Sequence, residues 1–312
     1  MAVDVATAAF VKQMAEARGK PLHESTPEEA RALGPAMAAT YGPAPEMARV
    51  EEHSIPVSDG EITLRVLVPI EPPRGVLVYY HGGGWVIGSI DEYDTMARKL
   101  AERTSCAIVL VEYRLAPEHR YPTAVDDSYA ALEWAGEHVQ EIAGSEVPLI
   151  IAGDSAGGNL AAVMALRARD RGGPRMALQV LIYPATDTNF DRPSYMDPEN
   201  QLLLTRDGVI WFWDHYLPDV SRRSEPDASP LHAPDLAGLP PAVVLTAEHD
   251  PLRDEGEAYA ERLSEAGVEV NFKRHLGQMH AFFSLLMLPG GERGFQQVVK
   301  AVRACIMREA KT

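Results

Sequence analysis

The sequence predicts an α/β protein with a mostly parallel, eight-stranded sheet flanked by helices. Two observations carry this prediction: short β-rich segments alternate with longer helical patterns, and most of the β-rich segments are almost continuously apolar. Continuous apolar runs are typical of parallel strands buried on both faces, and the alternation is typical of strands joined by crossover helices. The expected strands are residues 53–58, 61–69, 75–82, 107–114, 147–154, 177–185, 241–250 and 268–275.

The first two expected strands form a hairpin that adds an antiparallel edge to the sheet. Asp59-Gly60 lies between them, and an Asp-Gly pair between two β segments is a strong hairpin signal. The remaining strands are separated by helical patterns, which places helices on both faces of the sheet. The expected helices are residues 92–104, 123–142, 156–169, 252–266 and 295–308.

Two regions do not follow this alternation and are expected to be helical. Residues 1–50 contain a helical pattern over residues 5–18 and a second helix that starts with the capping box of Thr26 and Glu29 and runs to about Thr40. Residues 189–230 separate two strands and are rich in leucine and aromatic residues; connections this long often form lids or binding elements. Residues 51–188 and 231–312 then form the main α/β domain.

Composition excludes several classes of function. The 312 residues include 29 Lys and Arg against 45 Asp and Glu, a formal net charge of −16, which argues against nucleic-acid binding. The longest apolar runs are only strand-length, so no membrane span is expected, and the N-terminus lacks the basic start of a signal peptide. Cys106 and Cys305 are the only cysteines. They are expected to be free thiols in a cytoplasmic protein, with a single disulfide between them left open.

One short segment has the form of a nucleophile turn. Residues 153–157 read Gly-Asp-Ser-Ala-Gly and lie between an expected strand and an expected helix. In that context a sharp turn projects the serine hydroxyl above the sheet, small residues let the neighbouring backbone approach, and the first N–H groups of the helix stay free for an anion. A phosphate-binding P-loop would need Gly-Lys-Ser/Thr, whereas Gly158 is followed by Asn159 and Leu160. Ser155 is therefore the candidate nucleophile.

A glycine-rich loop offers a partner for this turn. Residues 81–85 read His-Gly-Gly-Gly-Trp and follow the strand expected at residues 75–82. Consecutive glycines expose backbone N–H groups that can stabilise a developing oxyanion. Because the carboxyl ends of parallel strands meet at one edge of the sheet, this loop and Ser155 are expected to share a crevice.

A reactive serine also needs a base and an acid that orients the base, in the chain order serine, acid, histidine. Asp250 directly follows an expected strand, with Glu248 as its near rival and Asp254 in or beside the next helix. Among the histidines beyond Ser155, His280 lies in the loop after the strand that we expect to end at His275. Order and location favour Asp250 as the acid and His280 as the base.

Five motifs in order resemble the bacterial hormone-sensitive-lipase family of esterases: HGGGW, YRLAPEHRYP, GDSAGGN, EHDPLRDEG and QMHAFF, within residues 81–283. The resemblance implies an α/β-hydrolase fold with a helical cap, to which residues 1–50 and 189–230 would belong. It also implies a serine carboxylesterase acting on short- to medium-chain acyl esters. It implies Ser155 as nucleophile, His280 as base and Asp250 as acid. The implied oxyanion hole consists of the N–H groups of Gly83, Gly84 and Ala156. The family often has glycine after the catalytic histidine, where this chain has Ala281.

The resemblance also sets expectations for partners. The substrate would be a small-molecule ester, with no cofactor, and a homodimer is possible. No His-Glu-x-x-His or comparable spacing occurs, so no metal is expected. The cap would limit acyl length, and the residues expected to contact substrate are Trp85, Trp211, Trp213 and Tyr216.

Two alternatives differ in function. The plant gibberellin receptors resemble this family but lack the catalytic histidine and bind their ligand, whereas this chain keeps His280. Amide hydrolysis or acyl transfer would use the same serine and oxyanion hole as ester hydrolysis, so the sequence does not separate them.

Overall fold

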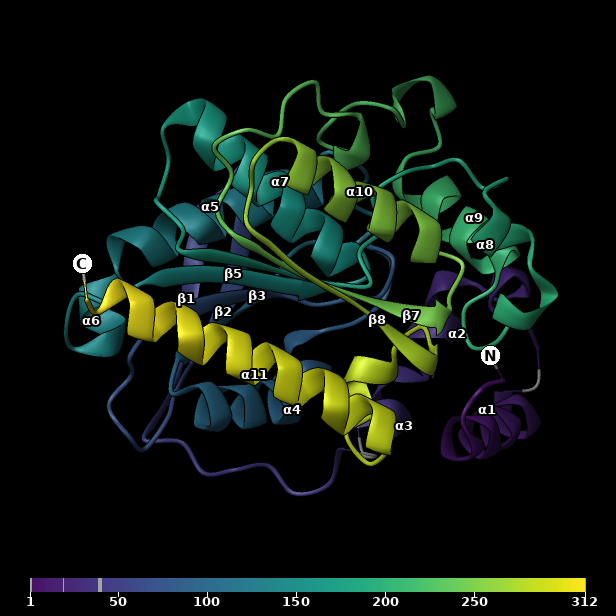
Figure 1. The fold of residues 1–312 in the computed structure, drawn as a ribbon, viewed down its shortest axis with the longest axis horizontal. Coiled ribbons are helices and arrows are strands. Elements are labelled where there is room, and N and C mark those ends of the chain that lie inside the picture. The colour runs from purple at the N-terminus through teal and green to yellow at the C-terminus, as the bar shows by residue number, and fades with distance from the viewer. Residues whose placement is uncertain (1, 19, 39–40, 312) are drawn as a thin grey trace.

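The computed structural model describes residues 2–18, 20–38 and 41–311, and its central element is an eight-stranded sheet (Figure 1). The strand order is β1-β2-β4-β3-β5-β6-β7-β8. β2 is antiparallel to both of its neighbours, β1 and β4, and every other pair of neighbouring strands is parallel. The strands are β1 (Arg49–Val57), β2 (Gly60–Val68), β3 (Val76–Tyr80), β4 (Ala107–Glu112), β5 (Leu149–Asp154), β6 (Leu178–Ile182), β7 (Ala242–His249) and β8 (Val270–Met279). The predicted mostly parallel sheet with an antiparallel leading hairpin is confirmed.

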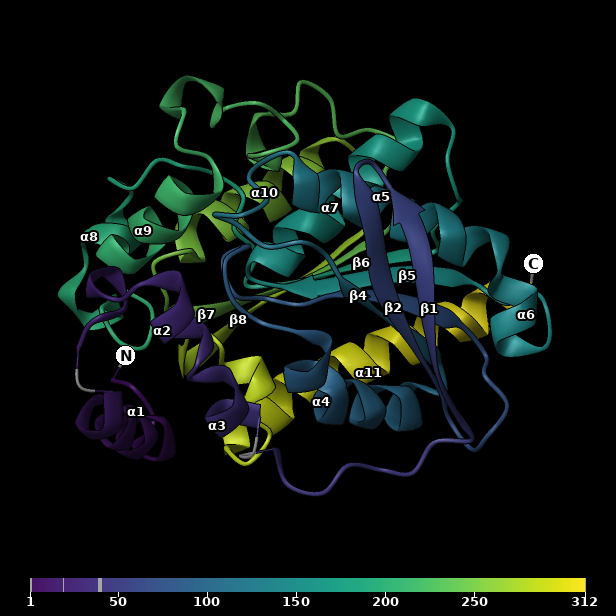
Figure 2. The same cartoon turned by 180° about the vertical axis from the view of Figure 1, so that it is seen from behind.

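Helices cover both faces of the sheet. Figures 1 and 2 show α5, α7 and α10 on one face and α4 and α11 on the other. The helix α7 (Ala156–Arg171) packs on β3, β5 and β6 beside α5, and it is buried from Ala156 to Ala168, which explains why the sequence there is rich in alanine and glycine. The other flanking helices are α4 (Ile90–Thr104), α5 (Thr123–Glu137), α6 (Val139–Ala143), α10 (Arg253–Glu265) and α11 (Pro289–Glu309).

The remaining helices lie together beyond the ends of β7 and β8 (Figures 1 and 2). They come from the two regions that the sequence set apart, and α9 packs on the short 3₁₀ helix η1 (Leu22–Glu24). These elements are α1 (Val5–Arg18), α2 (Pro27–Arg31), α3 (Gly34–Ala38), α8 (Pro193–Met196) and α9 (Arg206–Tyr216), with a short 3₁₀ turn at Pro198–Asn200. Further 3₁₀ turns follow at Val220–Arg222 and at Pro230–His232, and the second of these packs on α7 and α10.

The helix expected from Thr26 to about Thr40 is broken in the structure. Its start is confirmed, because Thr26 and Glu29 form the capping box, but α2 ends at Arg31 and α3 begins at Gly34. Pro35 has no N–H to donate and so cannot continue the ladder of α2. The expected end of this helix at Thr40 lies outside the described residues.

Two other sequence predictions are refined by the structure. The helix expected over residues 123–142 is interrupted at His138 and forms α5 and α6. Cys106 and Cys305 are both buried and free, so the disulfide left open by the sequence does not form. None of the described helices is long and apolar enough to span a bilayer.

Candidate active site

The turn between β5 and α7 holds Ser155 in an unusual backbone conformation. Its φ of 57° and ψ of −118° are rarely adopted by a residue with a side chain. Its N–H donates to the carbonyl of Ile182 at 2.9 Å, and its own carbonyl accepts from Asn159 at 3.0 Å and from Ala185 at 3.2 Å. These bonds to β6, α7 and the segment after β6 hold the strained turn in place.

Small residues on both sides of Ser155 make this turn possible. A Cβ atom on Gly157 would lie 1.9 Å from the carbonyl oxygen of Tyr80, and one on Gly153 would lie 2.1 Å from the carbonyl oxygen of Gly157. Any side chain at either position would therefore push α7 away from β3 and β5. The sequence prediction that these glycines make room for close backbone approach is confirmed.

The structure brings Ser155, His280 and Asp250 into one chain of hydrogen bonds. His280 Nε2 lies 3.0 Å from Ser155 Oγ, and His280 Nδ1 lies 2.8 Å from a carboxylate oxygen of Asp250. Asp250 is fully buried, and its other oxygen accepts the N–H of Leu252 at 2.9 Å. Since a carboxylate can only accept, Nδ1 carries the proton that donates to Asp250, and Nε2 is left to accept the Ser155 hydroxyl proton.

Strand pairing explains why Asp250 and His280 meet. β8 does not end at His275, as predicted, but continues to Met279, which pairs with His249 at the end of β7. An irregularity between Ala247 and His249 brings the two strand ends level, so that Asp250 and His280 each follow a paired residue. The prediction stopped at His275 because the next four residues, Leu-Gly-Gln-Met, include a glycine and no β-branched or aromatic residue.

The rival acids bind elsewhere. Glu248 accepts the N–H of Gly277 at 2.7 Å, and Asp254 accepts the N–H of Ser194 at 2.8 Å. His275 also points away from Ser155, with its Nε2 2.9 Å from Gln297. Of the candidates that the sequence left open, Asp250 is the one in contact with His280.

The glycine loop and the start of α7 face the same cavity as Ser155. Gly83, Gly84 and Ala156 all line it. Gly83 and Gly84 have φ values of 113° and 58°, and a Cβ atom on Gly84 would lie 2.2 Å from the ring of Phe212. Within the described part of the chain, the N–H groups of Gly83 and Gly84 have no acceptor, and that of Ala156 belongs to the open first turn of α7. Three donors are thus available beside the serine hydroxyl.

Asp154 connects the glycine loop to the serine turn. Its Oδ1 accepts the Gly82 N–H at 3.0 Å and the Tyr79 hydroxyl at 2.9 Å, and its Oδ2 accepts the Tyr93 hydroxyl at 3.0 Å. Burial raises the pKa of Asp154 to about 6, against the lowering effect of the hydroxyl bonds. Sequence reasoning missed this role of Asp154, although its place beside Ser155 and opposite the glycine loop was a usable signal.

The cavity has a volume of about 480 Å³. Only some of the aromatic residues that the sequence predicts to contact substrate line it. Trp85 and Trp213 line it, but Trp211 and Tyr216 do not, and this part of the prediction was wrong. Tyr216 is buried behind Trp85, and the centroids of these two stacked rings lie 4.2 Å apart. Trp211 packs against His215, with 4.5 Å between the ring centroids. Successive helix residues point about 100° apart, so Phe212 takes the position expected for Trp211.

The described side chains form no metal-binding cluster. Among residues 2–18, 20–38 and 41–311, no group of three or more His, Cys, Asp and Glu residues is arranged to hold a metal ion. His81 of the glycine loop is buried, with its Nδ1 2.7 Å from the carbonyl oxygen of Gly82, and burial lowers its pKa to about 4. It therefore supports the loop as a neutral imidazole.

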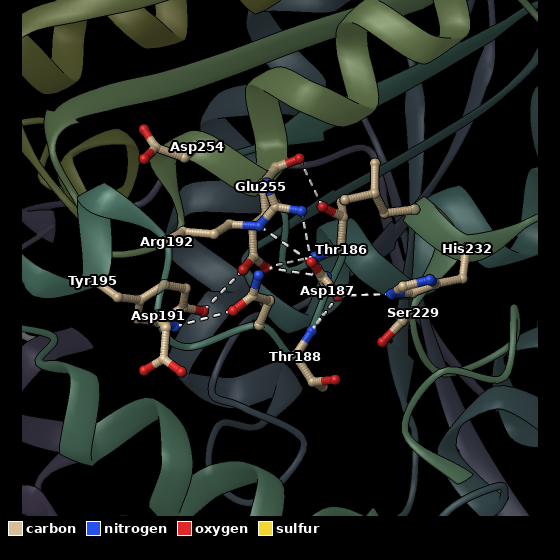
Figure 3. Close-up of polar contacts among 12 residues, drawn as sticks. Thr186, Asp187, Thr188, Asp191, Arg192, Tyr195, Ser229, His232, Asp254 and Glu255 are labelled. Carbon is tan, nitrogen blue, oxygen red and sulfur yellow. Dashed lines mark hydrogen bonds and ion pairs between the residues drawn. The ribbon is translucent and has the colours of Figure 1, made fainter. Parts of the chain in front are cut away.

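A buried polar network joins the segment after β6 to α10, which follows the Asp250 loop (Figure 3). Glu255 is fully buried; its Oε1 accepts the N–H groups of Thr186 and Asp187 at 2.8 and 3.3 Å, and its Oε2 accepts the Tyr195 hydroxyl at 2.9 Å. Figure 3 shows Asp187 between Arg192 and His232. Its Oδ2 accepts from Arg192 Nη2 at 2.6 Å, and its Oδ1 lies 2.8 Å from His232 Nε2.

A further bond reaches the loop itself. The Ser194 hydroxyl donates to the carbonyl of Pro251 at 2.6 Å, directly after Asp250. The helices of residues 189–230 are thereby tied to the backbone that carries the acid.

Glu255 makes the stability of the fold depend on pH. Burial, with Asp187 nearby, raises its pKa from 4.5 to about 8. A raised carboxyl pKa means that the folded state binds the proton more tightly than the unfolded chain, so the free energy of unfolding falls as pH rises through this range. The contribution of one such group is at most about 1.4 kcal/mol per pH unit.

We predict that the free energy of unfolding falls less with rising pH in Glu255→Gln than in the wild type. Urea unfolding at about pH 5.5 and about pH 8.5 should show a larger loss of stability in the wild type than in Glu255→Gln, because glutamine keeps the shape but cannot ionise. Glu261→Gln, an exposed change on the same helix, should behave as the wild type. Parallel losses in the wild type and Glu255→Gln would contradict the prediction.

Comparisons with known proteins agree with this geometry. A family model described as the alpha/beta hydrolase fold matches residues 77–284. The chain is 42% identical over 272 residues to the carboxylesterase NlhH of Mycobacterium tuberculosis, covering 83% of this chain and 85% of that protein. It is 35% identical over 295 residues to an ethyl acetate hydrolase of Pseudomonas putida, covering 91% and 92%.

A solved structure extends the likeness to three dimensions. A thermostable esterase from Pseudomonas putida superposes with a TM-score of 0.90 at 36% identity, covering 98% of each chain. The chain therefore belongs to the α/β-hydrolase family and is one of its carboxylesterases.

Proposed function

We propose that this carboxylesterase hydrolyses esters with Ser155 as nucleophile, His280 as general base and acid, and Asp250 as the orienting acid. The observation that carries the proposal is the hydrogen-bond chain from Asp250 through His280 to Ser155, at 2.8 and 3.0 Å, which ends in a cavity. His280 takes the hydroxyl proton as Ser155 Oγ attacks the ester carbonyl. Asp250 stabilises the imidazolium that forms and fixes its orientation.

The N–H groups of Gly83, Gly84 and Ala156 serve in this proposal as the oxyanion hole. Preorganised donors at the developing oxyanion are often the largest single contribution to catalysis of acyl transfer. His280 then protonates the departing alcohol, and water attacks the acyl-enzyme by the same route. The same three side chains therefore act in both steps, the formation of the acyl-enzyme and its hydrolysis.

The cap and the acyl preference belong to the same proposal. Residues 1–50 and 189–230 are proposed to form a two-part cap over the cavity of about 480 Å³, with residues 51–188 and 231–312 as the catalytic domain. A cavity of that size supports short- to medium-chain acyl groups, and Trp85 and Trp213, with Phe212, would contact them. The homodimer and the cytoplasmic location expected from the sequence stay predictions.

A panel of p-nitrophenyl esters from acetate to laurate tests the proposal. The wild type should hydrolyse the shorter esters best, and Ser155→Ala should lose roughly a million-fold in kcat, because removal of the nucleophile leaves only the oxyanion hole and binding. The release of p-nitrophenol is the readout, and matched melting curves check that the variant is folded. Turnover of the whole panel that does not depend on Ser155 would contradict the proposal.

The role of Asp250 has its own test. Asp250→Asn should lower kcat roughly 10⁴-fold, because the asparagine favours the wrong imidazole tautomer. Glu248→Gln should stay within a few-fold of the wild type, since Glu248 contacts the Gly277 backbone and not His280. A larger loss in Glu248→Gln than in Asp250→Asn would assign the acid to Glu248.

A further inference from the structure

The cavity beside Ser155 is lined mainly by apolar side chains, with a few polar groups among them. Leu204, Val209, Phe212 and Trp213 come from α9 and the segment before it, and Leu252 comes from the start of α10. The polar side chains of the lining include Tyr41, Glu92, Tyr93 and Ser284. A substrate bound here therefore meets apolar side chains and the carboxylate of Glu92 in the same cavity.

Among the described residues, Glu92 is a charged group of the cavity lining that forms no ion pair with an arginine or lysine. It lies in the first turn of α4, is partly buried and is hydrogen-bonded to Ser89, the N-cap residue of that helix. Its carboxylate packs on the bare Cα of Gly34: a Cβ atom there would lie 2.1 Å from Glu92 Oε1. Glycine at position 34 thus leaves room for a carboxylate that faces the cavity.

The charges around Glu92 do not compensate it. No ion pair joins Glu92 to a lysine or arginine of the described residues, and burial together with the neighbouring carboxylate of Glu112 raises its pKa. Arg31 also lines the cavity, but its guanidinium is bound to Glu118 at 2.7 Å and to the carbonyl of Val86 at 2.8 Å. The adjacent Asp91, in contrast, is exposed and paired with Arg65 at 2.7 Å.

We propose that Glu92 makes this enzyme select esters that carry an ammonium group. A half-buried carboxylate without a counter-ion gains free energy when a cation enters beside it, and it repels a substrate that carries a free carboxylate. The apolar side chains of the lining take the uncharged part of the same substrate. This substrate class rests on the proposed function of Ser155, because it assumes hydrolysis in this cavity.

Pairs of substrates equal in shape and different in charge test the proposal. The first pair is choline butyrate and its neutral isostere, in which carbon replaces the ammonium nitrogen. The second is the p-nitrophenyl ester of trimethylammonio-butyrate and its all-carbon isostere. We expect the wild type to prefer the cationic member of at least one pair roughly tenfold in kcat/KM. The pair that responds identifies whether the alcohol or the acyl group lies beside Glu92.

Variants then assign the preference to Glu92. Glu92→Gln should bring the cationic-to-neutral ratio of the responding pair close to one, and Glu92→Ala should do the same if the glutamine variant is poorly folded. Asp91→Asn removes the same charge one residue away, outside the cavity, and should keep the wild-type ratio. A wild-type ratio of one or less in both pairs, or an unchanged ratio in both Glu92 variants, would overturn the proposal.

The neutral esters separate this result from the proposed function. Loss of neutral p-nitrophenyl butyrate hydrolysis in Ser155→Ala tests the nucleophile alone. If that loss is observed while the cationic-to-neutral ratio of kcat/KM is the same in the Glu92 variants as in the wild type, the nucleophile assignment stands and only the ammonium preference is wrong.

Discussion

The strained backbone at Ser155 is the constraint on which the rest of the site depends. A residue with a side chain is held at a φ of 57° only because β3, β5, β6 and α7 meet around it and fix its N–H and carbonyl. That meeting requires glycine at positions 153 and 157, where a Cβ atom would collide with backbone oxygens. The same junction orients the Ala156 N–H and places Asp154 against the Gly82 N–H. Serine, glycine loop and first turn of α7 are therefore positioned by one packed junction.

The other half of the site is positioned by strand pairing and by the cap helices. The pairing of His249 with Met279 sets Asp250 beside His280, and the Glu255 network and the Ser194 bond to Pro251 hold the loop between β7 and α10. The arrangement of these elements also determines which side chains line the cavity. Its apolar side chains come in part from α9 and its Glu92 comes from α4, so one cavity combines leucine and aromatic side chains with the carboxylate of Glu92.

The sheet and the reacting groups were predictable because their signals are local. Buried parallel strands are continuous apolar runs, and the nucleophile turn needs serine and glycine at fixed spacing between a strand and a helix. Chain order was enough to choose Asp250 and His280, which the structure brings together with Ser155. One error was local, because Pro35 divides the helix whose start the capping box predicts. Others arose where tertiary contacts decide: pairing with β7 extends β8 to Met279. The direction of α9 decides that Phe212, and not Trp211, faces the cavity. Tyr79, Tyr93 and Glu92 carry no motif, so only the folded chain reveals what they contact.

Whether Ser155 reacts within reach of the three backbone donors is tested most directly by a crystal structure of the protein after reaction with a p-nitrophenyl alkylphosphonate. The tetrahedral phosphorus of this compound imitates the intermediate of ester hydrolysis. We expect phosphorus bonded to Ser155 Oγ, with the phosphoryl oxygen about 2.7–3.1 Å from the nitrogens of Gly83, Gly84 and Ala156. Phosphorus on another residue, or a phosphoryl oxygen directed away from these nitrogens, would contradict this expectation.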